Sequence, residues 1–144
     1  MEKVINSIGL SRDLIIHPGK TLIEVLEDRN MSQRELAIRT GVTEKHVSTV
    51  VHGQKNISPA FAKRLEYALG IEAEFWMNLQ ANYDREILEC EELNGVTTAE
   101  MAVLDSLKAE IGENTVKDPA AMVIAARHIM RISNLLDLAK VRKA

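Results

Sequence analysis

Polar and basic side chains gather between residues 44 and 52, and their types suit contacts with DNA bases and phosphates. Short hydroxyl side chains, a carboxylate, a lysine and imidazoles can all hydrogen-bond to base edges or to the DNA backbone. The outward-facing members of this stretch are Glu44, Lys45, His46, Ser48, Thr49 and His52. Their spacing predicts one exposed face of a short helix, with Val47, Val50 and Val51 on the buried side.

Two short helices joined by a tight turn must position this face. Ser32 is a favourable N-cap, and Glu35 three residues later completes a capping-box pattern. Gly41 follows the first helix, where a left-handed backbone conformation would end it. Thr43 caps the second helix, and Gly53 is placed to terminate it. The pattern predicts a helix-turn-helix unit, the arrangement that places a helix in a DNA groove.

A helical hairpin inside an ordinary bundle would give a similar pattern, so the flanking segments matter. One helix is predicted from Pro18 to about Arg29, before the pair. Two more follow, the first capped by Ser58 and closed by Gly70, the second running from about Glu72 to Leu93. This order is typical of a compact five-helix DNA-binding domain.

The residues of this segment resemble a known family. SQRELAIRTGV–T–EKHVSTVVHGQ is similar to the helix-turn-helix of the lambdoid phage repressors, the Xre-like class. The flanking IHPG and FWMNLQ-x-x-YD elements are more specific, and they resemble the HigA-type antitoxins of bacterial toxin–antitoxin modules. The resemblance covers residues 14–87. The same combination also opens longer proteins in which a metallopeptidase domain follows.

The resemblance implies a role for each polar residue of the unit. Gln33 would hydrogen-bond a phosphate; base edges would be contacted by Thr43, Glu44, Lys45 and Thr49. His46 and Ser48 would lie at the groove wall, and the backbone contacts would come from Gln54, Lys55 and Asn56. The repressors usually have a glutamine pair where this chain has Glu44 and Lys45. Since glutamate accepts from cytosine N4 and lysine donates to guanine, a half-site containing G·C is expected.

The same resemblance implies a dimeric transcriptional repressor that binds an inverted-repeat operator. It would also be the antitoxin of a type II module, which neutralises a RelE-like mRNA-cleaving toxin and autoregulates its operon. Two alternatives remain open: a stand-alone phage or plasmid regulator, and a protein-interaction module without a toxin.

Charge is unevenly distributed along the chain, whose net charge is −3. Residues 17–70 carry eight Lys/Arg against six Asp/Glu, whereas residues 71–96 carry one Arg against seven acids. An acidic segment complements a basic partner, and aromatic residues are enriched where apolar patches meet. The residues predicted to contact a second copy or a toxin are Trp76, Tyr83, Glu89, Glu91 and Glu92. Phe75 and Leu79 are expected in the core.

Asn94-Gly95 is the clearest break in the chain. The expected organisation is an arm over residues 1–16, a DNA-binding domain over 17–94 and a two-helix extension over 95–144. Thr98 would cap the first of these helices, and Asp118-Pro119 would start the second. Their apolar stripes, Met101-Leu104-Leu107-Ile111 and Met122-Ala126-Ile129-Met130 extending to Leu136, are too small for a core of their own. A second copy of the chain is the favoured cover.

The remaining features favour an all-α, cytoplasmic protein without enzymatic activity. Aromatic residues make up 3% of the chain and β-branched runs with turn pairs are lacking. No apolar run reaches the length of a membrane span. The lone Cys90 suits a reducing compartment as a helix-packing residue. The histidines form no HExxH pair and no phosphate-binding loop is present, so neither a metal nor another cofactor is expected.

Overall fold

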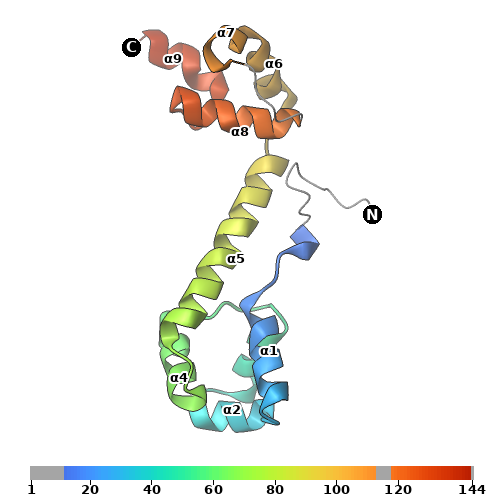
Figure 1. The fold of residues 1–144 in the computed structure, drawn as a ribbon, viewed down its shortest axis with the longest axis vertical. Coiled ribbons are helices and arrows are strands. Elements are labelled where there is room, and N and C mark those ends of the chain that lie inside the picture. The colour runs from blue at the N-terminus through green and yellow to red at the C-terminus, as the bar shows by residue number, and fades with distance from the viewer. Residues whose placement is uncertain (1–11, 113–117, 144) are drawn as a thin grey trace. The chain divides into compact units, whose positions relative to one another are not determined.

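The computed structural model describes residues 12–112 and 118–143, and these residues form helices without any strand (Figure 1). The predicted all-α class is confirmed. Two compact units divide the chain, one over residues 15–86 and the other over the remaining described residues. Most of the predicted N-terminal arm, residues 1–11, lies outside the described residues. No helix in the described part is long and apolar enough to cross a membrane.

The first unit contains the predicted five-helix arrangement. Its helices are α1 (Pro18–Asp28), α2 (Gln33–Thr40), α3 (Glu44–Val51), α4 (Pro59–Leu69) and the first part of α5 (Ala73–Asn94). α3 packs against α1 and α2, and α2 also packs against α4. α3, the second helix of the predicted pair, is therefore supported by α1 and α2.

Side-chain hydroxyls start three of these helices, as the sequence predicts. The hydroxyls of Ser32, Thr43 and Ser58 each accept a hydrogen bond from the backbone N–H three residues later, at 3.0, 3.0 and 3.1 Å. Each bond satisfies one of the free N–H groups of a helix start. Gly41 ends α2 with φ of 71° and Gly70 ends α4 with φ of 72°, the left-handed conformation that glycine adopts without strain.

One apolar core holds the first unit together. Its buried members are Leu22, Leu26, Leu36, Ala37, Val47, Val50, Val51, Ile57, Phe61, Ala62, Leu65, Leu69 and Trp76. Trp76 is fully buried, so its predicted contact with a second copy or partner is wrong. Phe75, expected in the core, is 41% exposed and packs its ring edge against Trp76 at 5.1 Å. The two aromatic residues exchange their predicted places because α5 is rotated relative to the expected register.

The second unit contains more helix than expected. Residues 98–143 form α6 (Thr98–Ser106), α7 (Lys108–Ile111), α8 (Pro119–Met130), the 3-10 turn η2 (Leu135–Asp137) and α9 (Leu138–Lys143), where two helices were predicted. Thr97, not Thr98, caps α6 by accepting from the Glu100 N–H at 3.2 Å. Asp118 caps α8 as predicted, by accepting from the Ala120 N–H at 3.3 Å. Of the predicted loop from Gly112 to Lys117, residues 113–117 lie outside the described residues.

The helix predicted to extend to Leu136 ends at Met130. Arg131 terminates α8 in a left-handed conformation with φ of 53°, although no glycine marks the position. The chain then turns and places Leu135 in the interior, while Leu136 is 48% exposed. Ile129, predicted on the apolar stripe, is also exposed, at 52%.

The residues after Gly95 form a small core of their own, contrary to the expectation that they could not. Its buried members are Leu104, Leu107, Val123, Ala126, Leu135 and Leu138. The expectation failed because η2 and α9 add two buried leucines to the two predicted stripes. The stripes therefore cover each other, which removes the argument that a second copy must cover them.

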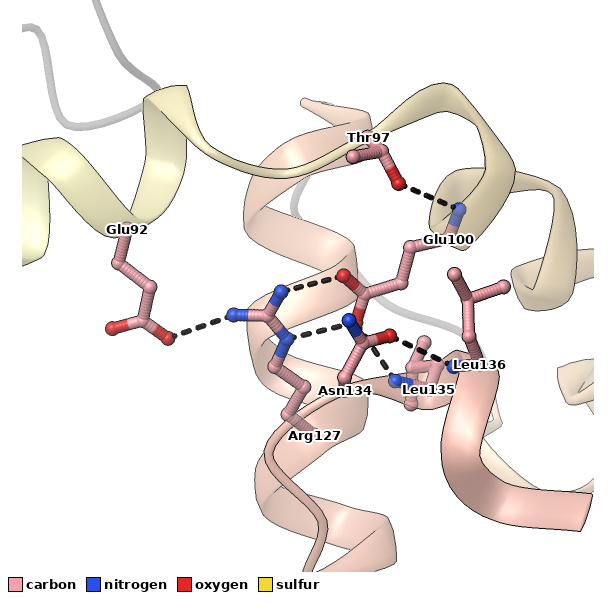
Figure 2. Close-up of polar contacts among 7 residues, drawn as sticks. All are labelled: Glu92, Thr97, Glu100, Arg127, Asn134, Leu135 and Leu136. Atoms are coloured by element: carbon pink, nitrogen blue, oxygen red, sulfur yellow. Dashed lines mark hydrogen bonds and ion pairs between the residues drawn. The ribbon is translucent and has the colours of Figure 1, made fainter. Parts of the chain in front are cut away.

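A buried carboxylate ties this second core together (Figure 2). The Glu100 side chain is 1% exposed and pairs with Arg127 through two hydrogen bonds, at 2.8 and 2.5 Å. It also accepts a bond from the Leu135 N–H at 2.8 Å. The third Arg127 nitrogen reaches Glu92 at 3.1 Å. These bonds hold the pKa of the Glu100 carboxyl below its usual range, with the Arg127 hydrogen bonds as the main cause.

Candidate nucleic-acid interface

Helix α3 separates its side chains into a buried face and an exposed face. Val47, Val50 and Val51 are buried in the first core, as predicted. Glu44 and Lys45 are exposed, and His46, Ser48 and Thr49 are half-buried. The helix is anchored by its apolar face and leaves its first turn open to solvent.

Six of the residues predicted to contact DNA line one shallow, open hollow beside α3. They are Thr43, Lys45, His46, Thr49, Gln54 and Lys55. The loop after α3 reaches this position because it folds back on the helix. The N–H groups of Gln54 and Lys55 both donate to the Thr49 carbonyl, at 2.9 and 3.2 Å. The structure therefore brings the predicted base-contacting and backbone-contacting residues together.

The hydroxyls on this face already have fixed partners. The Thr43 hydroxyl accepts from the His46 N–H, and the Thr49 hydroxyl donates to the His46 carbonyl at 2.8 Å. Because that bond uses the Thr49 proton, the oxygen is left to act as an acceptor. Ser48 lies 3.3 Å from the imidazole of His52, so these two side chains contact each other on the helix surface.

His46 lies deeper than the other polar residues of α3. Its ring packs on the ring of Phe61, with centroids 4.8 Å apart, and its Nδ1 atom lies 3.3 Å from the Lys55 ammonium. The Nε2 atom is buried without a hydrogen-bond partner. Burial, reinforced by Lys55 and Arg64, lowers the pKa of His46 below its ordinary value. A neutral His46 accepts from Lys55 and thereby directs that cation into the hollow.

The other predicted DNA contacts lie outside the hollow. Gln33 is half-exposed at the first position of α2, which is where a phosphate contact near a helix N-terminus belongs. Glu44 is exposed at the first position of α3, and Asn56 is exposed in the loop that follows α3.

Sequence reasoning assigned no role to two supporting residues. Arg64 on α4 donates to the carbonyls of Thr40 and Gly41, at 2.8 and 3.3 Å, and so pins the turn between α2 and α3. Gly19 on α1 lies against the end of α3: a Cβ atom there would be 1.9 Å from the Val50 carbonyl oxygen. The IHPG element signalled Gly19, but only the packing of α1 on α3 explains the glycine.

Comparison with known proteins supports this arrangement. A family model described as "Helix-turn-helix" (HTH_3) matches residues 22–76, from α1 to the start of α5. Virulence-associated protein I of Dichelobacter nodosus is 33% identical over 75 residues, covering 51% of this chain and 69% of that protein. The solved antitoxin HigA of Pseudomonas aeruginosa with the higBA promoter is 32% identical, over 68% of this chain and 96% of that chain, with a TM-score of 0.49.

The chain belongs to the helix-turn-helix family. A solved addiction module antidote protein of a HigA family from Coxiella burnetii is 27% identical over 69% of this chain and 98% of that chain, with a TM-score of 0.48. Nearly all of each of these two solved chains aligns with about two thirds of this chain.

The residues predicted to contact a second copy or a toxin differ in their burial and in their partners within this chain. Tyr83 is half-buried and meets the ring of His17 edge-on at 4.8 Å. Glu91 pairs with Arg12 at 3.2 Å, and Glu92 pairs with Arg127. Glu89 is exposed. Glu91 and Glu92 therefore have cationic partners inside the chain, and a toxin contact through either would compete with those pairs.

Proposed function

We propose that this protein is a sequence-specific DNA-binding repressor that acts as the antitoxin of a toxin–antitoxin module. The observation that carries the proposal is the hollow beside α3, where Lys45 and Thr49 of the helix and its N-cap Thr43 meet Lys55 of the following loop, while the opposite face of α3 lies in the core. Lysines and hydroxyls on the exposed face of a core-anchored helix are the groups that contact bases and phosphates. The resemblance of the IHPG and FWMNLQ-x-x-YD elements to those of HigA-type antitoxins supports the antitoxin role.

DNA binding is tested with the promoter of the protein's own operon. Binding to this duplex should fall steeply with salt, since each phosphate contact releases counterions, with a slope of about −0.9 per contact in a log–log plot. A footprint on the promoter locates the operator. Binding that is equally strong on promoter and random DNA would exclude a sequence-specific repressor, and no binding to either would favour a protein-interaction module.

The toxin is proposed to be a small basic ribonuclease of the RelE-like kind. Ribonuclease toxins need basic surfaces to hold RNA, and the acidic segment over residues 71–96 complements such a surface. The neighbouring reading frame should encode a short basic protein that co-purifies with this one. A stand-alone regulator would have no such neighbour and would purify without a partner.

Charge reversal on α5 tests the toxin surface. Glu89→Lys with Glu91→Lys should slow association with the toxin and reduce its salt dependence. Glu92 is left unchanged, because its partner Arg127 also holds the buried Glu100, whereas the pair that Glu91 makes with Arg12 is exposed on both sides. Reversal of Glu24 and Glu27, exposed acids of α1, provides the matched control. Equal association rates for both double variants would show that the acidic end of α5 is not the toxin surface.

A further inference from the structure

Two elements that flank the helix-turn-helix meet behind the loop that follows α3. His17 and Gly19 belong to the IHPG element, and Gln80 and Tyr83 belong to the FWMNLQ-x-x-YD element. His17, Gln80 and Tyr83 lie outside the residues that the family model matches. None of the four carries a role in the function proposed above.

Gln80 makes the central contact of this group. Its side chain is buried, with the residue 5% exposed, and its Oε1 atom accepts a hydrogen bond from the Ile57 N–H at 2.8 Å. Its Nε2 atom donates to the Asp84 carboxylate at 2.9 Å, which fixes the amide with its oxygen toward the loop. A buried backbone N–H without a partner is destabilising, so this bond favours the loop position in which the Ile57 N–H reaches Gln80.

His17 supports the same loop from the opposite end. Its Nδ1 atom accepts from the Gly19 N–H at 2.9 Å, which caps α1 and fixes the ring. The ring lies against Gly53, where a Cβ atom would be 3.6 Å from His17 Cγ, and Tyr83 covers it from α5. Gly53 opens the loop and Ile57 closes it, so both ends of the loop are held by residues of the two flanking elements.

The residues held between these two ends are Gln54, Lys55 and Asn56. Their own side chains are exposed. We propose that His17, Gly19, Gln80, Tyr83 and Asp84 form one brace that sets the position of this loop for contact with DNA phosphates. They are positioning residues and need not touch DNA. This proposal rests on the proposed DNA binding.

Replacement of Gln80 by methionine tests the brace in the full-length protein. Methionine keeps the side-chain volume, but it cannot donate to Asp84 and its thioether sulfur is only a weak acceptor for the Ile57 N–H. The exposed side chains proposed to contact phosphates are not substituted in this variant, so only their positions change. Gln80→Met should weaken binding to operator and random DNA alike, and the magnitude of the salt slope should fall by about 1–2, the loss of one or two phosphate contacts.

Two controls separate positioning from stability. The first control is Leu69→Ala, which removes a buried core side chain outside the loop. Its loss of thermal stability should be similar to that of Gln80→Met, but it should keep the wild-type salt slope. Asp84→Asn retains an acceptor for the Gln80 amide and should bind DNA like the wild type, whereas Asp84→Leu should resemble Gln80→Met. Hydrogen exchange at the Ile57 amide reports the brace directly, and its protection should be lost in Gln80→Met.

The outcomes distinguish the brace from the function on which it rests. If the wild-type protein shows no salt-dependent DNA binding, the proposed function fails. If the wild type binds and Gln80→Met keeps the wild-type salt slope, or loses affinity only as much as Leu69→Ala, Gln80 is a core residue and the brace proposal is overturned. Unchanged protection of the Ile57 amide in Gln80→Met would overturn it as well, whether or not DNA binds.

Discussion

At the scale of single residues, the two lysines of the hollow provide a matched pair. Lys45 is exposed in the first turn of α3, whereas Lys55 lies in the loop after it, beside His46. Lys45→Ala should cost about 1–3 kcal/mol on the operator and much less on random DNA, because a base contact is lost. Lys55→Ala should weaken both by similar factors. Competition titrations with the two duplexes measure the difference, and equal losses for Lys45→Ala would make it a phosphate contact.

The glycine in the first turn of α1 should be intolerant of a side chain. An added Cβ atom in Gly19→Ala would lie 1.9 Å from the Val50 carbonyl oxygen, so α1 must move away from α3. Forced overpacking of this kind costs about 1–3 kcal/mol, and here the obstacle is backbone. Thermal unfolding of Gly19→Ala should show that loss, and operator affinity should fall with it. In Gly95→Ala the nearest atom would be at 3.2 Å, and the loss should be smaller.

Two histidines should make the first unit sensitive to pH. Burial lowers the pKa of both His17 and His46 below the ordinary 6.5; Asn56 and Asp84 oppose the shift at His17, whereas Lys55 and Arg64 increase it at His46. The unfolded chain therefore binds more protons than the folded chain as pH falls. The stability from these groups is fully present above their ordinary pKa and is lost as pH drops through the folded values.

Chemical denaturation between pH 7.5 and 5 checks the histidine prediction. The wild type should lose stability across this range, and the variant with both His17→Asn and His46→Gln should lose less. Asparagine is a good N-cap, so the start of α1 is preserved in the variant. The lowered pKa of Glu100 acts only at lower pH, below the ordinary carboxyl value of 4.5, and does not confuse the comparison. Parallel pH profiles for the two proteins would contradict the assignment.

At the scale of helices, local signals predicted the starts well and the packing less well. Ser32, Thr43, Ser58 and Asp118 were identified from sequence because a cap needs only its own helix. The exchange of Phe75 and Trp76 was not predictable, since neighbouring residues on a helix differ by about 100° in direction and both are aromatic.

Contacts distant in sequence were also beyond prediction. Nothing near Gln80 in the sequence shows that it accepts a hydrogen bond from the Ile57 N–H. The end of α8 at Arg131 lacks the glycine that usually marks a left-handed cap. The small second core depends on Leu135 and Leu138, which follow that unmarked end.

The buried pair between α6 and α8 should control the fold of the second unit. Glu100→Ala leaves Arg127, whose side chain is 15% exposed, without its main partner, and breaking a pair this buried costs about 3–5 kcal/mol. Limited proteolysis should then cut within residues 95–143 while residues 15–86 resist. Replacing both residues with methionine should restore part of the resistance. Equal cleavage of wild type and Glu100→Ala would show that the pair contributes little.

At the scale of the whole molecule, one α3 helix offers too few base contacts to select a single operator. Two copies on an inverted repeat, with half-site centres about one helical turn or a multiple apart, supply the missing contacts. Light scattering at saturating protein should find two chains per operator duplex. One chain per duplex at saturation would contradict this prediction. Because the apolar stripes after Gly95 cover each other, they do not identify the dimer interface. The same light-scattering measurement on surface variants locates it.

The division of α3 into an anchored face and an open face has an evolutionary consequence. Val47, Val50 and Val51 maintain the fold, whereas Glu44 and Lys45 are exposed and make no contribution to the core. Changes at the exposed pair can alter which DNA sequence is preferred without lowering stability. Duplicated copies of the operon could therefore diverge to separate operators through a few substitutions, and a library randomised at these two positions should yield folded proteins with new target sequences.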